Sequence, residues 1–244
     1  GGYSKLKRSP APTVFAPISP RTLDASLTGV TYNDELTQKL YATTSTNKLI
    51  EIDPSNLSID RSVNLHEDPF SPATGGGNLY VLSGHGAKIQ RVLLRQMTVV
   101  GETEVDSPSA PGDWHGKGVR LAVDRPNNHR VVVATENKNG TTSLDLFVDL
   151  HHTDRILNEG RENTGLWLSN NRVFATSRDD IAVVTGDAPG FSTRFNKPPM
   201  HYTVAPGAGQ VVERGSGQLC TGNGSIFDLN SPLPFVVATF RYSD

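Results

Sequence analysis

Short apolar runs separated by polar turns recur along this chain. The clearest copy has one run at Leu40–Thr43 and a second at Leu49–Ile52, with polar residues between them and Pro54 after them. Apolar runs of this length, bounded by Asn, Asp, Gly, Pro and Ser, are typical of short β-strands. The pattern therefore predicts two neighbouring strands that are joined by a polar turn.

Four further copies of this two-strand unit follow. Their first strands are predicted at Leu79–Ser83, Val131–Thr135, Val173–Ser177 and Leu219–Thr221. Their second strands are predicted at Ile89–Leu93, Leu144–Val148, Ile181–Val184 and Ile226–Leu229. The mean spacing of the five copies is about 45 residues, which is in the range of a four-stranded propeller blade.

The other strands of each unit are fainter in the sequence. Inner strands are predicted at Val119–Val123 and Leu166–Leu168, and outer strands at Ile59–Leu65, Thr98–Val105 and Phe235–Phe240. The second unit has no good inner strand, because residues 69–77 are rich in proline and glycine. Thr13–Ile18 is flanked by prolines and is a candidate closing edge strand.

Two stretches carry a resemblance to known repeats. Asn47–Pro54 followed by Leu57–Asp60, and Gly118–Asp124 before Arg130–Thr135, resemble the blades of β-propellers of the YVTN and NHL kind. No Trp-Asp dipeptide marks the ends of the units, which argues against the WD-type group. The resemblance implies an all-β propeller of about five four-stranded blades.

Two alternatives for the fold stay open. A sixth blade is conceivable if residues 13–25 help to complete it, and a two-sheet β-sandwich is the rival architecture. We expect a single domain over residues 13–244, since all-β domains commonly reach this length. Residues 1–12 are basic and punctuated by proline, so we expect a mobile N-terminal tail there.

Composition limits the partners. The formal net charge of −2 disfavours nucleic acid, whose phosphates require clustered Lys and Arg. We find no apolar window of about 18 residues, so we expect no membrane insertion and a soluble protein. The single cysteine, Cys220, allows no internal disulfide and is expected to be a buried, inert thiol.

Propeller topology sorts the loops into two groups. The turn between the second and third strands of each blade, and the connector to the next blade, open on the same face. Four histidines are predicted on this face: His66, His85, His115 and His201. Imidazole and carboxylate groups are ordinary metal ligands, so this set is a candidate site for a divalent metal, although its members have no metal-ligand spacing.

The same long-connector face carries the candidate ligand-binding residues. Long loops on a rigid scaffold are common places for function. The candidates are Asp113, Trp114, His115, His201 and Tyr202 in connectors, with Arg178 and Asp179 in a facing turn. Aromatic members of this set are suited to stacking on sugar rings. The alternative is that these are solvated loop residues with no common target.

Catalytic signatures are missing from the sequence. It contains no Gly-X-Ser-X-Gly elbow and no phosphate-binding loop. The pair His151-His152 is predicted to lie in a surface turn, because adjacent residues leaving a strand point to opposite sides. Calcium-dependent lactonases of the gluconolactonase type are similar propellers, but Lys117-Gly118 and Thr164-Gly165 stand where an acid or amide would be wanted.

Three functions are therefore weighed. We expect a non-catalytic recognition domain, without a required cofactor, that binds a protein or carbohydrate ligand through the long-connector face. A metal-dependent hydrolase resembling the lactonases, and a structural module or surface spike of a larger assembly, are the alternatives. We expect an extracellular or surface-exposed location, and the sequence leaves the oligomeric state open.

Overall fold

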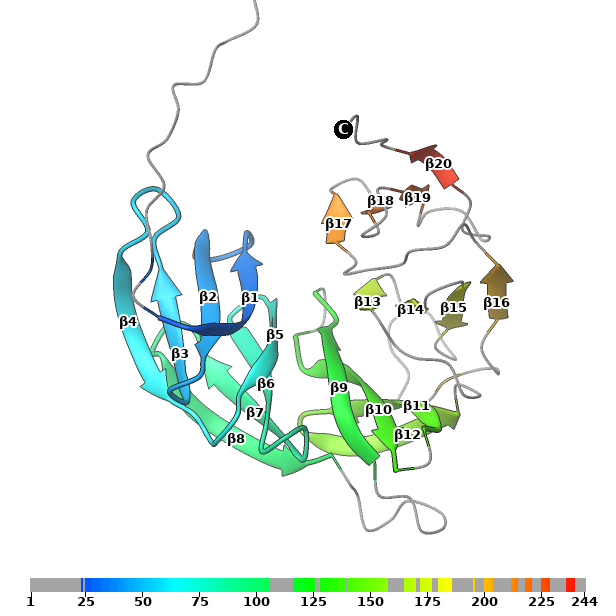
Figure 1. Ribbon diagram of the computed structural model, residues 1–244, viewed down its shortest axis with the longest axis horizontal. Coiled ribbons are helices and arrows are strands. Elements are labelled where there is room, and N and C mark those ends of the chain that lie inside the picture. Colours follow the sequence, from blue (N-terminus) through cyan, green and yellow to red (C-terminus); the bar gives the residue numbers. More distant parts are fainter. Residues whose placement is uncertain are drawn as a thin grey trace, which may run out of the picture.

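The computed structural model consists of β-strands and turns throughout the residues that it describes (Figure 1). Five four-stranded antiparallel sheets follow one another along the chain, and within each sheet the strands lie side by side in sequence order. The described residues are 23, 25–105, 116–125, 128–138, 140–157, 165–169, 172–176, 180–185, 195, 200–203, 212–214, 218–220, 225–228 and 236–239.

The strands of the first three sheets have well-matched lengths. The first sheet consists of β1 (Leu27–Asn33), β2 (Lys39–Thr44), β3 (Lys48–Ile52) and β4 (Ile59–Asn64). The second consists of β5 (Phe70–Gly75), β6 (Asn78–Ser83), β7 (Lys88–Leu93) and β8 (Thr98–Glu104). The third consists of β9 (Gly116–Val123), β10 (Arg130–Asn137), β11 (Thr142–Val148) and β12 (His151–Leu157).

The last two sheets have shorter strands. The fourth sheet consists of β13 (Gly165–Ser169), β14 (Arg172–Thr176), β15 (Asp180–Thr185) and β16 (Met200–Thr203). The fifth consists of β17 (Val212–Arg214), β18 (Gln218–Cys220), β19 (Ser225–Asp228) and β20 (Val236–Thr239).

The sheets are arranged around a common centre. The first strand of each sheet lies nearest the centre and the last strand lies at the outside (Figure 1). The inner strands are β1, β5, β9, β13 and β17. Neighbouring first strands touch from β1 to β5, from β5 to β9 and from β9 to β13. This confirms the predicted five-bladed propeller, and the β-sandwich alternative is wrong because the strands form five separate sheets rather than two. The proposed tail and Thr13–Ile18 lie outside the described residues.

The second strand of each blade carries the core on both of its faces. In β6, Leu79 and Val81 pack toward the first sheet, whereas Tyr80 and Leu82 pack toward the third. Because successive side chains of a strand point to opposite faces, a strand buried on both sides must be apolar throughout. This explains the unbroken apolar runs in the sequence, and each such buried side chain contributes about 1.5–3 kcal/mol.

One strand was missed in the sequence. Residues 70–75 form β5, the inner strand that the second unit was expected to lack. The register shifts between Phe70 and Ala73, so Pro72 lies in a bulge, and Ser71 has a positive φ of 49°. Proline is tolerated here because β5 is the edge of its sheet and needs no donor on its free side. The first connector is consequently short.

Two loop assignments were also wrong. His151 and His152 open the outer strand β12 and pair with Val148 and Phe147, so they are not in a surface turn. His201 and Tyr202 belong to the outer strand β16 and not to a connector. They pair with Ala182 and Ile181 of β15. In both cases histidines lie at or near the start of the outer strand and give no strand signal, and β16 is also short.

Buried ion pairs recur at matching places in the first and third sheets. Glu51 in β3 is 4% exposed, lies opposite Arg61 of β4, and accepts hydrogen bonds from Arg61 Nε at 3.1 Å and Tyr41 Oη at 2.8 Å. Asp145 in β11 is fully buried and lies opposite Arg155 of β12, whose Nε is 2.5 Å from Asp145 Oδ1. A buried charge needs such partners, because desolvation without them is very costly.

Candidate binding face

The strand order places two sets of loops on one face of the propeller. These are the connectors between sheets and the turns that join the second strand of each sheet to the third. We call this side the connector face, and we call the side that carries the other turns the opposite face. In the first three sheets the second-to-third-strand turns of the connector face are residues 45–47, 84–87 and 138–141.

The predicted ligand residues are only partly placed by the structure. Asp113, Trp114, His115, Arg178 and Asp179 lie outside the described residues. The backbone of His201 and Tyr202 is in β16, as given above. His66 and His85 are described, and both lie on the connector face, where the sequence predicted them. The ligand set as a whole stays a prediction.

His66 belongs to an exposed charged cluster. Its Nε2 lies 2.6 Å from Glu102 Oε2, and Lys88 Nζ lies 3.2 Å from Glu102 Oε1. The hydrogen bond from His66, followed by that from Lys88, lowers the pKa of the Glu102 carboxyl. The backbone of His66 is fixed by the sheet, since its N–H donates a hydrogen bond to Oε1 of the buried Gln90 side chain at 2.9 Å.

His85 forms a second exposed pair. Its Nδ1 lies 2.6 Å from Asp68 Oδ2, and the two side chains are 67% and 53% exposed. Both residues have a positive φ, 55° for His85 and 52° for Asp68, so each stands on a tight turn. Each histidine therefore has one carboxylate as its partner. Within the described residues, no group of three or more His, Cys, Asp or Glu side chains could hold a metal ion.

The turn that carries His85 packs closely against the third sheet. Gly86 has a φ of 85°, and its carbonyl accepts a hydrogen bond from Gly118 N–H of β9 at 2.8 Å. A Cβ atom on Gly86 would come within 2.2 Å of Gly118 O. Only glycine permits this approach, and it brings the Ser83–Ala87 turn to the beginning of the inner strand.

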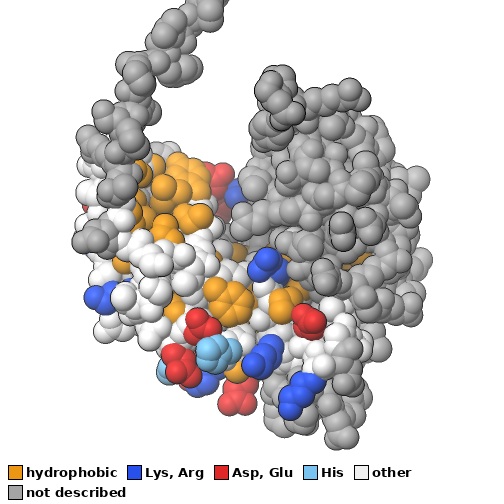
Figure 2. All heavy atoms as spheres, in the orientation of Figure 1, with side chains coloured by type: hydrophobic (Ala, Val, Ile, Leu, Met, Phe, Trp, Pro, Cys, Tyr) orange, Lys and Arg blue, Asp and Glu red, His pale blue; other side chains and the backbone are white. Residues whose placement is uncertain are grey.

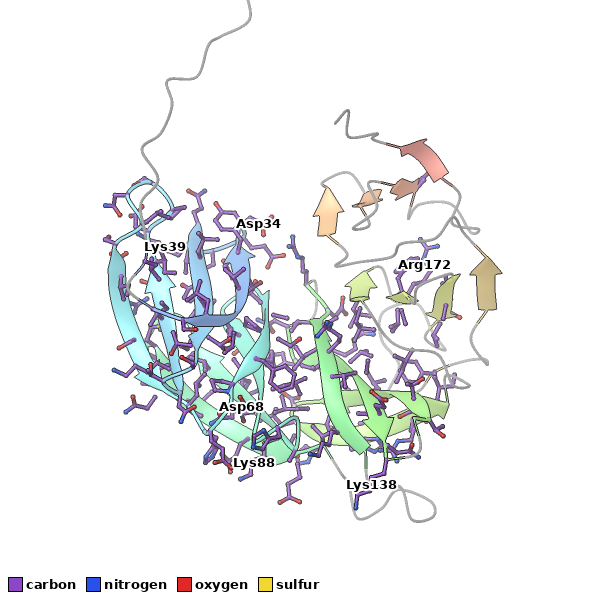
Figure 3. All side chains as sticks on the ribbon, viewed as in Figure 1. Asp34, Lys39, Asp68, Lys88, Lys138 and Arg172 are labelled. Atoms are coloured by element: carbon purple, nitrogen blue, oxygen red, sulfur yellow. The ribbon has the colours of Figure 1, made fainter. Side chains whose placement is uncertain are left out.

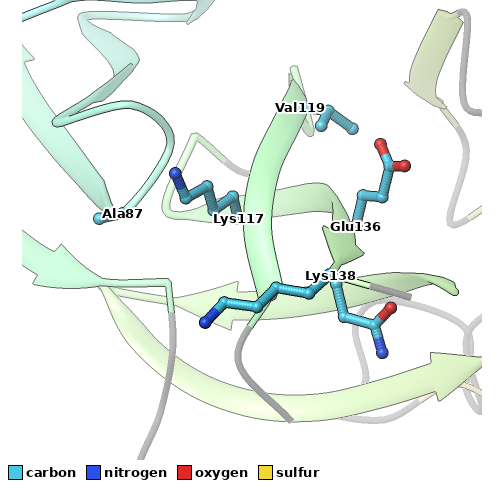
Figure 4. Close-up of a pocket in the computed structure, with 7 residues that line it drawn as sticks. Ala87, Lys117, Val119, Glu136 and Lys138 are labelled. Atoms are coloured by element: carbon cyan, nitrogen blue, oxygen red, sulfur yellow. The ribbon is translucent and has the colours of Figure 1, made fainter. Parts of the chain in front are cut away.

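A cavity of about 410 Å³ lies beside this contact (Figure 4). Its lining comes from one turn of the second sheet, the start of β9, and the end of β10 with the turn after it. The lining residues are Ala87, Gly116, Lys117, Val119, Glu136, Asn137 and Lys138. Apart from Val119, which lies further along β9, these positions are at the connector face, and the size falls in the range of ordinary ligand sites.

The charged groups of the cavity are turned in different directions. Figure 4 shows the side chains of Lys117 and Lys138 extending toward the side of Ala87, whereas Glu136 points the other way, near Val119. Lys117 and Glu136 are directly opposite in the ladder of β9 and β10, yet no ion pair joins them. Among the described residues neither lysine has a carboxylate partner.

The sequence predicts this cavity only in part. Lys117 follows a predicted connector of this face, whereas no motif singles out Glu136, Asn137 and Lys138. The available signal is their position at the end of the second strand of a blade and in the turn after it, which puts them on the connector face. What the sequence could not supply is the approach of Ala87 from the neighbouring sheet.

The described part of this face is rich in exposed charge. Figure 2 shows basic, acidic and histidine side chains gathered in the region where Figure 3 labels Asp68, Lys88 and Lys138. The opposite face also carries exposed charged pairs, such as His129 with Asp149, and polar side chains there tie neighbouring sheets together. Asn33 Nδ2 donates to Gly76 O at 2.8 Å, and Gly76 N–H donates to Glu35 Oε2 at 2.7 Å.

Comparison with known proteins is informative only at the level of structure. No protein-family model matches the chain, and no curated protein is similar in sequence. The β-propeller domain of Cps50 (Swd1) from Myceliophteria thermophila superposes with a TM-score of 0.65 at 11% identity, covering 92% of this chain and 74% of that one. The chain has the fold of a β-propeller.

A second solved structure supports the same propeller fold. Hydrazine synthase from Kuenenia stuttgartiensis superposes with a TM-score of 0.52 at 10% identity, over 88% of this chain and 80% of that one. At such identities the likeness extends to the fold alone, because propellers host many unrelated functions. None of the described elements is a helix that is long and apolar enough to cross a membrane.

Proposed function

We propose that this propeller is a recognition domain that binds a segment of a protein partner on its connector face. The observation that carries the proposal is the cavity beside Ala87, which combines apolar walls with charged groups at its rim. Ligand sites commonly have this composition, a concave apolar surface with a few polar groups that fix orientation.

A protein ligand is favoured over a carbohydrate by the lining. The described lining residues include lysine, glutamate, asparagine and small apolar residues. They include no aromatic side chain of the kind that stacks on sugar rings. Exposed pairs such as His85 with Asp68 give further polar contacts at the edge of the same surface. A carbohydrate ligand would have to rely on other parts of the face.

The test is a steric block. Ala87 is exposed on the turn at the mouth of the cavity, so Ala87→Trp should fill the mouth without altering any charge. Gln96→Trp is the matched control, since Gln96 is an exposed residue of the β7–β8 turn on the opposite face. Each variant and the wild type are applied to peptide and glycan arrays.

We expect the wild type and Gln96→Trp to capture the same peptides, and Ala87→Trp to lose them. Unchanged capture by Ala87→Trp would overturn the choice of site. Capture of glycans alone would show that the ligand is a carbohydrate and not a protein segment. Thermal unfolding of all three proteins should agree within a few degrees, which shows that the loss does not come from unfolding.

A further inference from the structure

The two lysines at the cavity have a specific chemical consequence. Lys117 and Lys138 are exposed, and their side chains extend to the same side of the cavity (Figure 4). Within the described part of the chain no carboxylate forms an ion pair with either ammonium group, although Glu136 lies opposite Lys117 in the ladder of β9 and β10. Two like charges on one side repel each other, and an anion between or beside them would relieve that repulsion.

The rest of the lining indicates which kind of anion fits. Ala87 and Val119 supply apolar wall, and Gly116 lines the cavity without a side chain. An anionic group on an apolar stem matches such a site better than a bare inorganic ion. Glu136 on the other side of β9 adds a negative charge that opposes a long polyanion, such as a nucleic acid strand.

We propose that Lys117 and Lys138 bind the side-chain carboxylate of an acidic residue, glutamate in particular, in a peptide segment of the partner protein. This inference rests on the proposed function, because it assigns the ligand class of the same cavity. The carboxylate lies at the two ammonium groups, and its methylene groups lie against Ala87, on the side of the cavity to which both lysines extend. Hydrogen bonds between ionised groups are about twice as strong as neutral ones.

The experiment compares two pools of fluorescent nonapeptides of otherwise identical composition. One pool has a fixed central Glu and the other a fixed central Gln, with small apolar residues at random beside it. Binding is measured by fluorescence anisotropy for the wild type and for the double variant Lys117→Met with Lys138→Met. Arg95→Met, which removes an exposed cation from the opposite face, is the matched control.

We expect the wild type and Arg95→Met to bind the Glu pool with about tenfold higher affinity than the Gln pool. This is the difference expected for one charge-assisted contact. The double variant should bind both pools equally. Equal binding of both pools by the wild type, or a preference that survives in the double variant, would overturn the inference. Lysine-dependent binding of a single-stranded oligonucleotide without preference between the peptide pools would also overturn it.

The two proposals fail in different ways. If Ala87→Trp abolishes peptide capture while the lysine substitutions change nothing, the binding face stands and the acidic ligand class is wrong. If Ala87→Trp leaves capture intact, the face itself is wrong, whatever the peptide pools show.

Discussion

Acidic side chains are used in two different ways in this propeller. Inside the sheets, Asp145 and Glu51 are almost completely buried, and each is fixed by an arginine from the next strand. On the connector face, Asp68 and Glu102 are 53% and 43% exposed and are paired with histidines. In both places a nitrogen-bearing side chain contacts the carboxylate, but only the carboxylates inside the sheets are shielded from water.

The difference lies in what the partner provides. A buried carboxylate has lost its water, so its arginine and hydroxyl partners are required for the fold. An exposed carboxylate keeps most of its hydration, and exposed pairs are typically worth only about 0–1 kcal/mol. The buried clusters therefore tie together strands within a blade, whereas the exposed pairs remain available for contacts with a ligand.

The largest effect is expected at Asp145. Its Oδ2 accepts hydrogen bonds from Thr135 Oγ1 and Ser143 Oγ, both at 2.8 Å, and its Oδ1 contacts His152 and Arg155. Asp145→Ala removes the acceptor for all four groups and should lower the free energy of unfolding by about 3–5 kcal/mol.

Urea denaturation measures this loss, and Asp68→Ala on the connector face is the control. Because Asp68 is exposed, its removal should change the unfolding free energy by less than about 1 kcal/mol. Equal losses in the two variants would mean that burial does not separate the two groups of carboxylates.

A smaller effect is expected at Tyr41. Its side chain is fully buried, and its hydroxyl donates to Glu51 Oε2 at 2.8 Å; burial raises the pKa of this phenol to about 12. Tyr41→Phe keeps the ring packing and removes one partner of Glu51, while Arg61 remains. The unfolding free energy should fall by about 1–2 kcal/mol, measured by the same denaturation. No loss would show that Arg61 alone satisfies Glu51.

The smallest effect is expected at Glu102, as a dependence on pH. The folded-state pKa of this carboxyl lies below its usual value of 4.5, so its pairing stabilises the fold above that pH. The contribution is lost as the pH falls through the lower folded value. His66→Gln should move the pKa of Glu102 upward, because His66 is its main partner.

A titration of the Glu102 carboxyl carbon by NMR follows this shift directly. Lys88→Met is the graded comparison, since Lys88 is the second cause of the lowered pKa. A larger shift in Lys88→Met than in His66→Gln would reverse the assigned order of the partners.

The sequence predicted the fold well where strands are buried on both sides. The runs Leu79–Leu82 and Val131–Ala134 are apolar throughout because each lies between two neighbouring sheets, and they revealed the repeat. The edge strands gave weaker signals. β5 contains Pro72, and β12 begins with His151-His152, because an edge or outer strand need not be apolar on both faces.

The sequence was enough to predict which face of the propeller carries the candidate site, but not that this face contains a cavity. Strand order assigns His66 and His85 to the connector face, and the structure places them there. The cavity depends on the close approach of the turn at Gly86 to Gly118 in the next sheet. Such a contact joins residues that are far apart in sequence and belongs to no local pattern, so it appears only in the structure.

Hydrogen exchange with and without the best captured peptide tests the central claim most directly. If the connector face binds the ligand, amide protection should rise in residues 84–87, 116–119 and 136–138, which surround the cavity. The turns of the opposite face at residues 34–38 and 94–97 should exchange as in the free protein. Protection confined to the opposite-face turns, with no change around the cavity, would contradict the account.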